Sequence, residues 1–80
     1  MDFEKVVDKI VKVVFGEEIS EEDRARILKT LRVEYNRIVE IVPKNEKLRE
    51  YAENVARHFA FLEAKEIKES KRWQNEVYGR

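Results

Sequence analysis

The apolar residues of this chain recur at helical spacing, and very few residues interrupt that spacing. Gly16, Pro43 and Gly79 are its only glycines and proline. Between them, apolar side chains return every three or four positions, which places them on one face of a helix. No segment shows the sustained alternation of a half-buried strand. The sequence therefore predicts an all-α protein, a three-helix antiparallel bundle with short loops and a long, overhanging C-terminal helix.

The first helix is expected at about residues 3–15. Asp2 is suited to cap its start, and Gly16 can close its end in a left-handed conformation. Its many valines favour a strand locally. The spacing of Phe3, Val7 and the residues that follow nevertheless favours a helix, because the charged residues between them do not alternate.

Two longer helices follow, at about residues 21–42 and 46–77. Ser20 is a capping residue for the second helix, and Pro43 ends it, because a proline pushes the preceding residue out of helical geometry. The third helix starts from Asn45 or the Pro43 turn. At a rise of about 1.5 Å per residue, the second helix is roughly 33 Å long and the third roughly 48 Å. The third helix should therefore overhang the bundle beyond about Ile67.

The third helix has two apolar faces. We assign the core to the face with the larger side chains, and expect Phe59, like Leu31 of the second helix, to be a large buried core residue. That face consists of Leu48, Tyr51, Ala52, Val55, Ala56, Phe59 and Leu62. A second stripe, Ala60, Phe61, Ala64 and Ile67, is turned by well over 90° from it. Two shorter helices cannot easily cover both faces, so we expect Phe61, Ala64 and Ile67 to contact a partner.

Large side chains also occur in the overhang. Trp73 and Val77 return to the first face, and Tyr78 adds another ring. Trp and Tyr are residue types that dominate interface energetics, and the overhang leaves this segment uncovered by the second helix, so Trp73, Val77 and Tyr78 are included in the predicted partner-binding surface. The alternative is that Trp73 folds back over the turn between the first two helices and packs on Phe15 or Ile19.

The composition limits how such a small chain can be stabilised. Its 80 residues make one domain, and a domain of this size buries only about 60% of its unfolded surface. It has no cysteine and a single histidine, His58, so disulfides and thiolate or imidazole metal clusters are excluded. No cofactor is expected. Oligomerisation remains as a source of stability, and a homodimer or a place in a larger complex is expected.

The charged residues suggest where the protein works and add a nucleic acid as an alternative partner. They make up 42% of the chain, with 17 basic and 17 acidic residues. Enrichment in Lys and Glu is typical of hyperthermophile proteins, so we expect a thermophilic, archaeal, cytoplasmic protein, with no membrane span and no signal-peptide layout. Basic residues on the outer face of the second helix make a nucleic acid the alternative partner. They are Arg26, Lys29, Arg32 and Arg37.

An acidic cluster lies at the turn between the first two helices. Carboxylates in a first helical turn are stabilised by the helix dipole, so this cluster does not require a metal ion. It comprises Glu17, Glu18, Glu21, Glu22 and Asp23. Basic residues of the third helix should lie level with it and complement its charge: Lys65, Lys68, Lys71 and Arg72.

No catalytic constellation stands out. There is no glycine-rich phosphate loop, and neither Ser20 nor His58 has a partner pattern that marks a nucleophile or a general base. The segment IKESKRWQNEV, residues 67–77, resembles the last helix of the all-helical chorismate mutases. That resemblance implies that Ser70 and Gln74 face a substrate. The chain departs from the family in its first helix, which is short and ends at Gly16 instead of being very long. We therefore expect a small non-enzymatic adaptor or accessory subunit without a small-molecule substrate.

Overall fold

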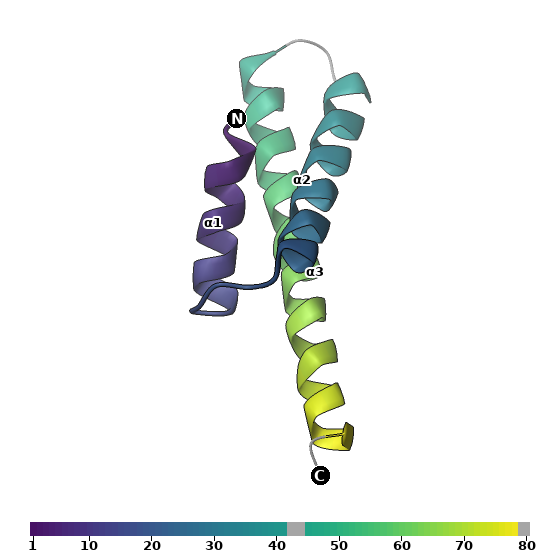
Figure 1. Ribbon diagram of the computed structural model, residues 1–80. Helices are drawn as coiled ribbons and strands as arrows, with labels where there is room; N and C mark the ends of the chain where they lie inside the picture. Colours follow the sequence, from purple (N-terminus) through teal and green to yellow (C-terminus); the bar gives the residue numbers. More distant parts are fainter. Residues whose placement is uncertain (42–44, 79–80) are drawn as a thin grey trace.

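The structure, a computed structural model, describes residues 1–41 and 45–78, with side chains described as far as Ser70. It contains α1 (Phe3–Val14), α2 (Glu21–Ile41) and α3 (Glu46–Tyr78). α1 and α2 both lie along the first part of α3, and α3 then continues alone past the turn that joins them (Figure 1). The described residues contain no strand. The predicted all-α three-helix bundle with an overhanging third helix is confirmed.

The capping residues act as the sequence indicated. The Lys5 backbone N–H donates to Asp2 Oδ1 at 3.3 Å, and Gly16 closes α1 with φ of +71°. The Asp23 N–H donates to Ser20 Oγ at 3.2 Å at the start of α2. The Lys47 N–H donates to Asn45 Oδ1 at 2.9 Å, so Asn45 caps α3. Each of the three N-terminal caps, Asp2, Ser20 and Asn45, satisfies a backbone donor that the first helical turn leaves without a partner. Pro43, the expected end of the second helix, lies outside the described residues.

The core combines bulky side chains from two helices with small side chains from the third. α1 and α2 contribute branched aliphatic residues, while α3 contributes mostly alanine. The buried core residues are Val7, Ile10, Val11, Val14, Ile27, Leu31, Ala52, Ala56, Ala60, Ala64 and Ile67. Because an alanine side chain is small, it lets a neighbouring helix come close enough for its branched side chains to pack on the α3 backbone.

The face of α3 assigned to the core from the sequence is wrong. Its alanines Ala52 and Ala56 are buried, but Tyr51 is 58% exposed, Phe59 43% and Leu62 45%. The core lies instead on the side that carries Ala56, Ala60, Ala64 and Ile67. Close packing of whole helices outweighs the burial of single large side chains here, because the aromatic rings would hold α1 and α2 further from α3.

Polar contacts fix α1 against the other two helices. Arg24 of α2 contacts Glu4 and Asp8 of α1, at 2.6 Å each. The ammonium group of Lys68 in α3 donates to the Val14 carbonyl at 2.9 Å, which satisfies an acceptor at the C-terminal end of α1. The second contact also shows that α1 ends level with Lys68. Beyond that level α3 has no neighbouring helix in Figure 1.

The contact between α3 and its neighbouring helices has room for alanine but not for a larger side chain. Ala60→Leu should lower the free energy of unfolding by about 1–3 kcal/mol, because the added atoms have no space between the helices. Ala25 on α2 is exposed, so Ala25→Leu is a matched control and should change stability by less than about 0.5 kcal/mol. Urea denaturation followed by circular dichroism measures both. Equal effects of the two substitutions would mean that α3 does not pack through its alanines.

Leu31 and Phe59 differ in how far they are buried, so their replacement by alanine should have different costs. Leu31 is fully buried, so Leu31→Ala should cost about 2–5 kcal/mol through lost burial and the cavity left behind. Phe59→Ala should cost less than about 1 kcal/mol, because nearly half of that ring already contacts water. Denaturation is measured on dilute protein, so that association does not contribute. A larger loss of unfolding free energy for Phe59→Ala than for Leu31→Ala would show that the face of α3 with Phe59 is buried in the core.

Candidate functional site

The most distinctive surface feature is a line of large apolar side chains along α3. Three of its members, Tyr51, Phe59 and Leu62, are each about half exposed. Leu48 and Val55 complete the line and are partly exposed. We call this set, Leu48, Tyr51, Val55, Phe59 and Leu62, the α3 stripe. Neither Leu48 nor Val55 belongs to the core or to the apolar layer packed against it.

The α3 stripe is continuous because its spacing follows the helical repeat closely. Successive members are three, four, four and three residues apart. These four steps cover 14 residues in about four turns, or about 3.5 residues per turn, and this heptad-like spacing keeps all members on one side of the helix over this length. The stripe spans roughly 21 Å and is turned by about 120° from the buried alanines. A partner helix could therefore contact all of it without disturbing the core.

Polar and basic side chains border the α3 stripe. The His58 ring packs edge-on against Phe59, with centroids 6.3 Å apart. Lys47 and Lys65 are exposed, and the Lys65 ammonium lies 5.7 Å from the centroid of the Phe61 ring. The described surface next to the stripe therefore combines apolar contact area with a polar border, as interaction surfaces commonly do.

Of the predicted partner contacts at Phe61, Ala64 and Ile67, the last two are wrong and the first stays a prediction. Ala64 is 0% exposed and Ile67 2%, so both belong to the core of their own chain and cannot meet a partner. Phe61 is half-buried and packs against that core. Its outer part lines a cleft of about 350 Å³ together with Val13 and Val14. For Ala64 and Ile67 the prediction is wrong because their side chains pack against helices of the same chain instead of a helix from another chain.

The remaining predicted contacts are not tested. Trp73, Val77 and Tyr78 lie on the backbone of α3 but outside the residues whose side chains are described. The two alternatives for Trp73 therefore both remain. Phe15 and Ile19, its proposed partners within the chain, pack against the core.

The basic residues of α2 do not form one shared surface. Arg26 reaches towards α3 and contacts Glu63 at 2.7 Å, while Arg32 lies towards α1, 5.9 Å from the centroid of the Phe3 ring. Arg37 contacts Glu34 within its own helix at 3.7 Å. Lys29 is exposed. A groove that follows phosphates needs cations side by side, whereas these cations point in different directions and mostly engage residues of the same chain.

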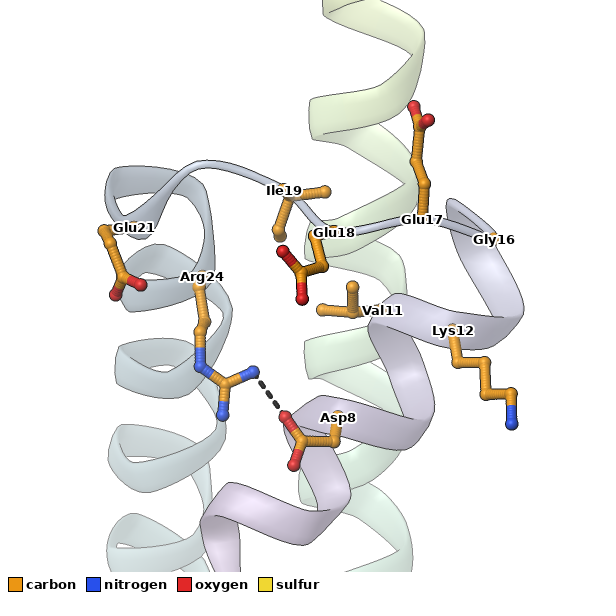
Figure 2. A pocket seen from close by; sticks show the side chains of 9 residues that line it. All are labelled: Asp8, Val11, Lys12, Gly16, Glu17, Glu18, Ile19, Glu21 and Arg24. Carbon is orange, nitrogen blue, oxygen red and sulfur yellow. Dashed lines mark ion pairs between the residues drawn. The ribbon is translucent and has the colours of Figure 1, made fainter.

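A cleft of about 490 Å³ lies between α1, the following turn and α2. Figure 2 shows the Arg24 guanidinium directed at Asp8 across it, with Glu17, Glu18 and Glu21 around the turn. The hydrogen bond with Glu4, together with the neighbouring Asp8, raises the pKa of Arg24 above its ordinary value. The guanidinium is thus committed to joining the two helices. Lys68, expected to complement the acidic cluster, donates to a backbone carbonyl instead.

The described part of the chain shows neither a metal site nor a membrane-spanning helix. Within residues 1–41 and 45–70, whose side chains are described, no group of His, Cys, Asp and Glu side chains is placed to hold a metal ion. None of the helices described is long and apolar enough to cross a membrane. No family model, curated protein or solved structure matches the chain. The local resemblance to chorismate mutases gains no support from them. Ser70 is exposed, and the Gln74 side chain lies outside the described residues.

The sequence did contain a signal for the true arrangement. Ala52, Ala56, Ala60 and Ala64 recur every four residues, which places small side chains along one ridge of the helix. Such a ridge is suited to close helix packing. Reading the alanines as a helix-contact face would have left the larger side chains of α3 as the exposed surface.

A matched pair on α3 tests which aromatic residue belongs to the fold. Phe61→Glu should lower the free energy of unfolding by about 1–3 kcal/mol, because it places a charge against the core. Phe59→Glu should leave helical content and stability nearly unchanged in dilute protein, because that position contacts water. Thermal melts followed by circular dichroism compare them. If the Phe61→Glu variant were stable and the Phe59→Glu variant unfolded, Phe59 and not Phe61 would belong to the core side of α3.

Proposed function

We propose that this protein is a small non-enzymatic interaction module that binds another protein through the α3 stripe. The observation that supports this proposal is the exposure of Tyr51, Phe59 and Leu62 in one line on a regular helix. Isolated exposed apolar residues are ordinary on protein surfaces. A contiguous line bordered by polar groups is typical of an interaction site.

The chemistry of the α3 stripe suits a helical or grooved partner surface. An amphipathic helix contacts its partner through side chains three and four residues apart, and the stripe has this spacing over roughly 21 Å. Aromatic residues contribute most at such contacts, because each buries a large area with few rotatable bonds. Tyr51 and Phe59 are therefore the expected anchors, with Leu48 and Leu62 at the two ends.

Covering the α3 stripe would also stabilise the protein, because it would remove large apolar side chains from water. Removing a large apolar side chain fully from water contributes about 1.5–3 kcal/mol. A domain of 80 residues has little stability in reserve, because ordering its chain offsets most of the gain from burial. The Lys- and Glu-rich composition supports a thermophilic, archaeal and cytoplasmic setting as part of the same proposal, where association would add stability on heating.

The test is photo-crosslinking in living cells. A photoreactive phenylalanine analogue replaces Phe59, and in a control it replaces Lys9, which is exposed on α1. We expect discrete protein adducts from position 59 and none from position 9. Adducts at neither position, or equally at both, would contradict an interaction function of the stripe. The mass of the adduct then shows whether the partner is the same chain or a different protein.

A further inference from the structure

We propose that the partner of the α3 stripe is a second copy of this chain, paired antiparallel about a two-fold axis at Val55. This inference rests on the proposed function and specifies its partner. In the pair, Val55 faces Val55 of the second copy. Leu48 of each copy faces Leu62 of the other, and Tyr51 of each faces Phe59 of the other.

The spacing of the stripe is symmetric about Val55. Leu48 and Leu62 lie seven residues on either side of it, and Tyr51 and Phe59 lie four. A two-fold axis through Val55 therefore brings leucine opposite leucine and aromatic ring opposite aromatic ring. A two-fold dimer uses one patch twice, so the patch must complement itself, and this arrangement does so in size and chemistry.

The surface area of the chain also fits a dimer. Its accessible surface is 6358 Å², whereas a compact monomer of 9.7 kDa has about 5,100 Å². The excess of about 1,200 Å² accompanies an elongated shape of 53 × 19 × 17 Å. A stable interface of standard size buries about 800 Å² from each partner. Part of this excess belongs to the overhang of α3, so it sets an upper limit on the area that a second copy laid along the α3 stripe can cover.

The bordering charges provide a specific signature of this pairing. Lys47 and Lys65 are 18 residues apart, which is about five full helical turns, so they lie on the same flank of the stripe. An antiparallel two-fold pair brings equal flanks together. Lys47 of one copy therefore lies near Lys65 of the other, and the wild-type dimer contains two repulsive contacts that a substitution can reverse.

Disulfide trapping tests the register directly, because the chain has no cysteine of its own. Val55→Cys should form a disulfide-linked dimer on mild oxidation. Leu48→Cys and Leu62→Cys should each remain mostly monomeric alone, but should link to one another when mixed. Efficient self-linking of Leu48→Cys would show a parallel pair and overturn the proposal. Failure of both Val55→Cys and the mixture to link would also overturn it.

Charge reversal gives an independent measurement. Lys47→Glu replaces both repulsive contacts with ion pairs and should lower the dimer Kd about fivefold, as measured by sedimentation equilibrium. Lys9→Glu makes the same charge change on the outer face of α1 and should leave the Kd unchanged. Equal shifts in the two variants, or weaker association of Lys47→Glu, would contradict the antiparallel register.

The crosslinking result separates the two proposals. Adducts from position 59 only with other proteins, together with a wild-type monomer at all concentrations, would refute the homodimer while leaving the interaction function intact. The absence of any adduct at position 59 would refute both.

Discussion

α1 and α2 pack against the alanine ridge of α3, and this packing determines which side chains of α3 are buried and which face water. Ala56 and Ala60 are fully buried, and their small size lets Ile27 and Leu31 pack near the α3 backbone. Because α1 and α2 cover the alanine side of α3, the larger side chains of α3 lie on the sides that these two helices do not cover. The same packing that forms the core therefore leaves Tyr51, Phe59 and Leu62 exposed to water.

The helix that carries the α3 stripe is also the helix on which α1 and α2 pack. Two shorter helices cover one side of it, and their contacts end near Lys68, whose ammonium group binds the end of α1. The α3 stripe lies alongside the covered part of the helix, about a third of a turn away from the core. It is consequently held on a backbone that is already fixed by packing. A partner can bind a fixed helix without the entropic cost of ordering it.

The sequence predicted much of the fold but misplaced the candidate site. Helix boundaries followed from local chemistry: the Asp2, Ser20 and Asn45 caps and the left-handed Gly16 all act within one turn. The buried face of α3 depends on how whole helices fit together, which local hydrophobicity does not determine. Phe59 is more hydrophobic than Ala60, yet Ala60 is buried because its size permits closer helix packing. Ala64 and Ile67 were misassigned as partner contacts for the same reason.

We propose that the α3 stripe is the self-associating surface of this chain. An isotope-filtered nuclear Overhauser experiment on a mixture of labelled and unlabelled protein tests it most directly. Leu48 and Leu62 are roughly 21 Å apart within one helix, so a methyl cross-peak between them can arise only between two chains. If the two copies pair about Val55, that cross-peak is observed together with one between the Val55 methyls of the two copies. Intermolecular cross-peaks confined to other surfaces, or none in concentrated protein, would contradict it.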